Sequence, residues 1–110
     1  MIRKQISPIP GCVRVCFELP AHMWADHITL VGDFNNWDRH ATPLKQDRDG
    51  SWRVVLDLAS GKLFAFRYLI DGNWQTDIHA DGFINNRAGL ESCLLDTSNN
   101  QLNLQFKERL

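Results

Sequence analysis

The chain has 110 residues, of which 44% are hydrophobic and 23% charged, a composition typical of one globular domain with a full hydrophobic core. Its formal net charge is −1 and its Lys and Arg residues are scattered, so nothing indicates a nucleic-acid or anionic-lipid partner. No apolar run approaches the ~20 residues of a membrane span or resembles a secretory signal, so we expect a single cytoplasmic domain over residues 1–110, without a membrane partner.

The first half of the chain predicts two strands. Residues 1–10 contain two prolines and are expected to run extended over the surface. Residues 13–19 alternate apolar and polar side chains, as a strand with one buried face does, and Pro20 ends the pattern. A second strand is expected at about 27–32, which is rich in β-branched and aliphatic residues. It breaks into Gly-Asp-Phe-Asn-Asn, residues typical of turns, and Trp37 follows directly.

Turn residues divide the second half of the chain. Asp49-Gly50, Ser60-Gly61 and Asp71-Gly72 are strong turn signals, and Trp74 follows the last of them. Residues 77–87 are expected to form a loop. The expected strands cover residues 52–58, 63–71, 90–95 and 101–107, the last marked by alternating Leu102, Leu104 and Phe106. About seven to eight short strands with no helical period predict an all-β fold, an immunoglobulin-like antiparallel β-sandwich.

Three cysteines do not make a disulfide framework. Cys12 and Cys16 lie four residues apart in one predicted strand, so their Cα atoms would be ~13 Å apart. A disulfide tolerates at most about 7 Å. Pairing of either residue with Cys93 stays open, but free thiols in a reducing cytoplasm are the preferred interpretation.

Two tryptophans stand just beyond turns rather than within strands. A flat indole stacks well on an apolar surface with a polar rim, such as the C–H face of a pyranose ring. The neighbouring amides of Asn36 and Asn73 can donate to and accept from sugar hydroxyls. Arg67 lies on the non-core face of its predicted strand and adds a directional donor. Trp37 and Trp74 are therefore candidates for a binding platform, and the alternative is that both cap the ends of the sandwich.

The sequence offers residues for two other types of site. Asp77, His79 and Asp81 alternate and would share one face of a strand, as metal ligands do, but no fourth ligand follows at a motif spacing. Asp77 and Asp81 are also candidates for a pair of glycosidase carboxylates, but such a pair needs a cleft that a sandwich of this size hardly offers. We therefore expect no metal, no cofactor and no catalytic residue.

Four longer motifs resemble those of a known family. They are Leu-Val-Gly-Asp-Phe-Asn-Asn-Trp at 30–37, Pro-Leu at 43–44, Asp-Gly-Ser-Trp at 49–52 and Phe-Arg-Tyr-Leu-Ile-Asp-Gly-Asn-Trp at 66–74. In order and spacing they resemble the family-48 carbohydrate-binding modules, over roughly residues 12–95. That family includes the N-terminal early set domains of isoamylases and glycogen-branching enzymes, and the glycogen-binding domain of the AMP-activated protein kinase β subunit. The resemblance implies a sandwich of the early set type.

The resemblance also implies a function, the non-catalytic binding of α-glucan such as glycogen, starch or maltooligosaccharide. By motif position Trp37 and Trp74 would stack on α-1,4-linked glucose, and Arg67 stands where kinase-type members have a sugar-contacting lysine. Phe34 would then anchor its loop in the core. The kinase-type Leu-Gly-Thr-x-Asn segment corresponds to residues 88–92, where Thr and Asn are lost and Ser92 or Glu91 would substitute.

A second hypothesis is a protein–protein interaction or assembly module that kept the sandwich and lost sugar binding. Two features support this hypothesis. The Thr and Asn of the kinase-type segment are missing, and the apolar residues 102–106 would add an edge strand or pair with another copy of the chain. Many members of the family are attached to a catalytic or kinase partner, so a glucan-metabolising enzyme, or the chain itself, is an expected partner. An enzyme is the third and least supported reading.

Overall fold

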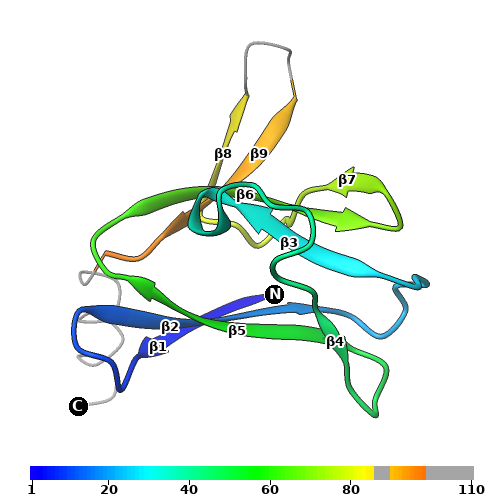
Figure 1. Cartoon of the computed structure of the whole chain (residues 1–110), viewed down its shortest axis with the longest axis horizontal. Helices are drawn as coiled ribbons and strands as arrows, with labels where there is room; N and C mark the ends of the chain where they lie inside the picture. Colours follow the sequence, from blue (N-terminus) through cyan, green and yellow to red (C-terminus); the bar gives the residue numbers. More distant parts are fainter. Residues whose placement is uncertain (86–89, 99–110) are drawn as a thin grey trace.

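The computed structural model describes residues 1–85 and 90–98, which form two antiparallel β-sheets (Figure 1). The strands are β1 Ile2–Ile6, β2 Cys12–Leu19, β3 Ile28–Gly32, β4 Lys45–Gln46, β5 Trp52–Ala59, β6 Leu63–Ile70, β7 Asn73–Gln75, β8 Gly82–Asn85 and β9 Glu91–Asp96; one 3-10 turn, η1, covers Asp33–Asn35. The first sheet, sheet A, has the order β1-β2-β5-β4. The second, sheet B, has the order β3-β6-β9-β8, and β7 also pairs with β6.

The predicted fold class is confirmed: the chain is an all-β, immunoglobulin-like antiparallel sandwich. The described residues hold nine strands, more than the seven to eight expected. The segment expected to run over the surface contains β1, which pairs with β2. The expected loop at 77–87 contains β8, which pairs with β9. The strand predicted at 101–107 lies outside the described residues.

The core follows the alternation that the sequence shows. In β2 the odd-numbered side chains are buried and the even-numbered ones are not. Phe17 of β2 meets Phe66 of β6 edge to face, with ring centres 5.4 Å apart, and Phe66 in turn packs on Tyr68. Full burial of one such side chain stabilises the fold by about 1.5–3 kcal/mol. The contact between Phe17 and Phe66 joins the two sheets.

Ion pairs reinforce the sheets at their margins. Lys4 Nζ lies 2.6 Å from Asp81 Oδ2 and so ties β1 to the segment that precedes β8. Arg14 donates through two nitrogens to Asp57 on the neighbouring strand, at 3.0 and 3.1 Å. That contact, together with the Ser7 hydroxyl, lowers the pKa of Asp57.

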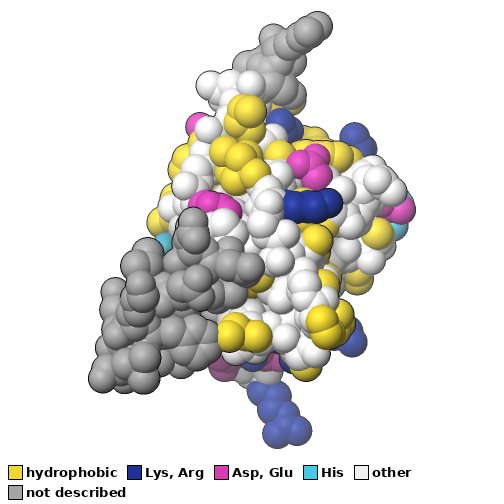
Figure 2. All heavy atoms as spheres, turned by 90° about the vertical axis from the view of Figure 1, so that its left-hand side faces the viewer, with side chains coloured by type: hydrophobic (Ala, Val, Ile, Leu, Met, Phe, Trp, Pro, Cys, Tyr) yellow, Lys and Arg dark blue, Asp and Glu magenta, His cyan; other side chains and the backbone are white. Residues whose placement is uncertain are grey.

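Cys12, Cys16 and Cys93 are free thiols, which is the interpretation that the sequence favours over a disulfide with Cys93. Cys93 is buried, and burial raises the pKa of its thiol. Within the described ranges no helix is long and apolar enough to cross a membrane. Figure 2 shows one side of the sandwich, where lysine and arginine side chains stand apart from one another among acidic and apolar ones.

Candidate functional site

The end of β3 approaches β6 unusually closely, and Gly32 makes that possible. A Cβ added to Gly32 would lie 2.6 Å from the carbonyl oxygen of Ala65 and 2.8 Å from Phe66 Cβ. Real Cβ atoms essentially never come so near, so any larger residue would push the two strands apart. The turn η1 therefore starts from a fixed point directly against β6.

The loop after η1 is closed by the side chain of Asn35. Its amide oxygen accepts from the backbone N–H of Gly32, and its amide nitrogen donates to the Leu30 carbonyl and to Thr42 Oγ1. The three distances are 3.1, 2.9 and 3.0 Å. Asn35 thus joins the two ends of the loop and has a structural role.

Trp37 stands on a strained backbone. Asn36 and Trp37 both have φ of 57°, in the left-handed region that side chains other than glycine's rarely adopt. Such a conformation costs roughly 1–2 kcal/mol per residue. Strain of this kind persists only where surrounding contacts enforce it, and it gathers at ligand sites.

Two groups enforce the position of Trp37. Its backbone N–H donates to the Gly32 carbonyl at 2.9 Å. Its indole Nε1–H donates to Asp33 Oδ1 at 2.8 Å, while Asp33 Oδ2 accepts from the Ala65 N–H at 2.7 Å. The indole stays 37% exposed. Phe34, by contrast, packs against the core and contacts Phe17, as expected.

Trp74 is placed by a tight hairpin. β6 and β7 are joined by Asp71 and Gly72, both with positive φ, as a two-residue turn of this type requires. The Asp71 carboxylate accepts from the backbone N–H groups of Asp26 and His27, which fixes the turn beside the start of β3. Trp74 pairs with Leu69, so its indole lies over the outer face of sheet B, 37% exposed.

Arg67 lies on that same outer face and is only 7% exposed. Its Nε donates to Ser92 Oγ on β9 at 3.0 Å. Its Cζ lies 5.6 Å from the ring centre of Trp74, which is within the range of a cation–π contact. The serine and the indole together hold the guanidinium across the sheet.

A second cation at the site was missed by the sequence analysis. Arg39, in the loop after Trp37, brings its Cζ to 5.5 Å from the same Trp74 ring centre. Nothing in the local pattern of that polar loop marks Arg39, because its contact depends on how the loop folds back toward β7.

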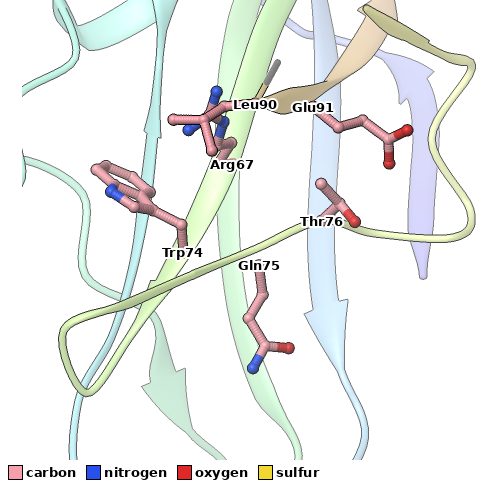
Figure 3. Close-up of a pocket in the computed structure, with 6 residues that line it drawn as sticks. All are labelled: Arg67, Trp74, Gln75, Thr76, Leu90 and Glu91. Carbon is pink, nitrogen blue, oxygen red and sulfur yellow. The ribbon is translucent and has the colours of Figure 1, made fainter. Parts of the chain in front are cut away.

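Two hollows in the surface share Arg67 and Trp74. The first, here called the indole hollow, has a volume of about 380 Å³ and is lined by Trp37, Ala65, Arg67, Trp74, Ile84, Asn85 and Ser92. The second, here called the β9 hollow, has about 390 Å³ and is lined by Arg67, Trp74, Gln75, Thr76, Leu90 and Glu91 (Figure 3). In Figure 3, the Glu91 carboxylate points away from Arg67.

Four of the six residues predicted to bind sugar line one hollow, the indole hollow: Trp37, Trp74, Arg67 and Ser92. Asn36, at the end of η1, and Asn73, the first residue of β7, are exposed but belong to the lining of neither hollow. Ser92 is buried, and its hydroxyl accepts from Arg67. Its place is therefore beneath the arginine.

The two acidic residues within 77–81, which the sequence offered as metal or catalytic candidates, make structural contacts. Asp77 is buried and accepts from the hydroxyl of Tyr68 at 2.9 Å, whereas Asp81 faces Lys4. His79 is exposed and lies near Asp77. Among the residues that the structure describes, no group of three His, Cys, Asp or Glu side chains is arranged to hold a metal ion.

The site thus offers two half-exposed apolar rings, a nearly buried guanidinium and a second guanidinium on an open surface. Indoles bind flat apolar faces, and guanidinium groups donate directional hydrogen bonds. This combination suits a ligand that has an apolar face and hydrogen-bond acceptors around its edge.

Comparison with known proteins agrees with this chemistry. The chain matches the family described as Carbohydrate-binding module 48 (Isoamylase N-terminal domain) over residues 21–84. It is 43% identical over 58 residues to a 1,4-alpha-glucan branching enzyme of Aquifex aeolicus, a stretch of 48% of this chain and 9% of that protein. It is 50% identical over 32 residues to a 1,4-alpha-glucan-branching enzyme of Emericella nidulans, covering 29% of this chain and 5% of the enzyme. The chain therefore spans only a small part of the length of these relatives.

Proposed function

The chain belongs to the carbohydrate-binding module 48 family, and we propose that it binds α-glucan such as glycogen, starch or maltooligosaccharide, without catalysing a reaction. One observation carries the proposal: Trp37 and Trp74, both 37% exposed, line the same hollow on the outer face of sheet B. Aromatic rings held at a polar surface are what a pyranose needs for stacking.

The proposed roles follow from the contacts. Trp37 and Trp74 stack on glucose rings, and Arg67, which is held by Ser92 and Trp74, donates to sugar oxygens. Ser92 acts through Arg67, because its hydroxyl oxygen accepts a hydrogen bond from Arg67 Nε. The amides of Asn36 and Asn73, exposed at the rim, are proposed to meet sugar hydroxyls of rings that extend beyond the hollow.

Binding to a single glucan chain should be weak. Two stacking contacts and a few solvent-exposed hydrogen bonds seldom reach the ~8 kcal/mol of a micromolar complex. Because the relatives named above are branching enzymes, a glucan-processing enzyme is the proposed partner that benefits from such a weak anchor. The cytoplasmic location stays a prediction.

The test is calorimetric titration of the protein with maltoheptaose. We expect measurable binding by the wild type and binding weaker by about fivefold or more in Trp37→Ala and Trp74→Ala, since a stacking contact is worth about 1–3 kcal/mol. Trp24→Ala is the matched control, because Trp24 is 97% exposed and lines neither hollow. No heat of binding in the wild type would refute the proposal and favour the assembly module, whose apolar residues 102–106 lie outside the described residues.

A further inference from the structure

Arg67 is a nearly buried cation, only 7% exposed. Within residues 1–85 and 90–98 no Asp or Glu oxygen lies within 4.0 Å of its guanidinium, and the hydrogen bond found for its side chain goes to the neutral hydroxyl of Ser92. Arg14, for comparison, forms a two-point pair with Asp57. Buried charges are normally paired, because removing a charge from water without a partner is costly.

Arg39 adds a second positive charge at the same place. The two guanidinium carbons lie 5.5 and 5.6 Å from one ring centre, that of Trp74. In the described part of the chain Arg39, like Arg67, has no ion pair with a carboxylate. Each cation lies within 6 Å of this ring centre, so both would attract a ligand that brings negative charge to the indole.

Of the acids that the structure describes, none forms an ion pair with Arg39 or Arg67. Asp33 already accepts from the Trp37 indole and from the Ala65 N–H. Glu91 lines the β9 hollow, but its carboxylate points away from Arg67 (Figure 3). The seven residues that line the indole hollow include no Asp or Glu. Arg67 is thus the one charged side chain among the described residues of its lining, and Arg39 lies nearby. The Asp33 carboxylate, which is bonded to Trp37 and Ala65, keeps its own negative charge.

We propose that the site selects α-glucan carrying a phosphate monoester, which Arg39 and Arg67 recognise while the indoles stack on adjoining glucose rings. This rests on the proposed glucan binding and adds the chemical class of the preferred ligand. A phosphate monoester carries about −1.5 to −2 charge at pH 7 and three acceptor oxygens. Guanidinium groups match phosphate with paired, charge-assisted hydrogen bonds.

The experiment compares maltoheptaose with maltoheptaose that carries one phosphate ester, by calorimetric titration of the whole chain. We expect the phosphorylated sugar to bind about tenfold more tightly, as one or two charge-assisted bonds would give. The preference should fall to about twofold or less at ~1 M salt, where the screening length is ~3 Å. It should fall likewise in Arg39→Gln but persist in Arg48→Gln, which removes an exposed arginine from the turn between β4 and β5.

The outcomes separate this inference from the function on which it rests. Equal affinity for the two sugars would overturn the phosphate preference and leave glucan binding standing. Binding of neither sugar would overturn both. A preference that survives in Arg39→Gln would refute this site. Inorganic phosphate titrated alone tests the source of the anion: binding as tight as that of the phosphorylated sugar would show a small-anion site and overturn recognition of a glucan ester.

Discussion

The indole N–H of Trp37 donates to one oxygen of Asp33 at 2.8 Å, and the other oxygen of Asp33 accepts from the Ala65 N–H of β6 at 2.7 Å. A single carboxylate therefore connects an exposed ring to a central strand of sheet B. Because the ring is oriented before a ligand arrives, less rotational freedom is lost on binding. Asp33 is in this sense a positioning residue for the proposed sugar platform.

Replacing Asp33 by Ala should weaken maltoheptaose binding about tenfold, since Trp37 then loses the hydrogen bond that orients it. The free energy of unfolding should fall by only about 1 kcal/mol, because the Ala65 N–H lies at an exposed place where water can replace the carboxylate. Calorimetric titration and urea denaturation measure the two effects. Asp26→Ala is the control, as Asp26 is exposed on the connector before β3. Unchanged affinity in Asp33→Ala would show that the bond does not matter for binding.

Asn36→Gly separates the backbone role of this residue from its proposed sugar contact. Glycine adopts a φ of 57° without steric cost, so the variant should be as stable as the wild type or up to about 1 kcal/mol more stable. If the amide meets a sugar hydroxyl, affinity for maltoheptaose should fall about two- to fivefold at the same time. Thermal denaturation and titration of one preparation give both values. An unchanged affinity would remove Asn36 from the site.

Gly32→Ala should destabilise the protein by about 1–3 kcal/mol, the usual cost of forcing atoms into a packed place. The added Cβ would meet the Ala65 carbonyl and Phe66 Cβ at under 3 Å, both on β6. Gly61→Ala provides the contrast, since its φ is +72° and nothing lies within 4 Å of an added Cβ. That variant should show only the cost of the left-handed backbone, roughly 1–2 kcal/mol.

Glucan titration distinguishes the two glycine variants further. Gly32→Ala displaces the loop that carries Trp37 and should lose affinity, whereas Gly61→Ala, in the turn between β5 and β6, should keep it. Equal affinities in the two variants would mean that the close approach of β3 to β6 does not position the site.

Much of the fold could be predicted because its strands alternate apolar and polar residues and end at Gly, Asp or Pro. The strands left out, β1, β4, β7 and β8, lie at sheet edges or are only a few residues long. In β8 three of four residues are exposed, so burial imposes little pattern on them. Edge strands are held mainly by backbone hydrogen bonds, and these bonds do not require particular side chains, so the sequence shows little of them.

The candidate site was predictable where a turn motif fixes a side chain, as for Trp74 behind Asp71-Gly72. Arg39 was not predictable, because its contact with Trp74 joins a loop to a hairpin that lies far along the chain. The burial of Arg67 could not be predicted either. The alternation of side chains along its strand places Arg67 on the outer face of the sheet, but does not show that neighbouring side chains cover it. Both properties depend on tertiary packing.

Tyr68 gives a prediction about alkaline pH. It is the one tyrosine of the chain, fully buried, and donates to the buried carboxylate of Asp77 at 2.9 Å. Burial, and next the charge of Asp77, raise the pKa of Tyr68 well above its usual range. The folded protein should therefore show no phenolate absorbance as the pH passes about 10, where an unfolded tyrosine ionises.

The sign of the stability change follows from that shift. Below pH ~10 both states keep the phenolic proton, so the contribution of Tyr68 is complete. Above it only the unfolded chain releases the proton, so the free energy of unfolding falls by up to about 1.4 kcal/mol per pH unit. Tyr68→Phe should lose about 1–3 kcal/mol at neutral pH, because Asp77 loses a donor, and should show a shallower alkaline decline than the wild type. Phenolate absorbance at pH ~10 with the circular dichroism of the folded state intact would contradict the burial of this hydroxyl.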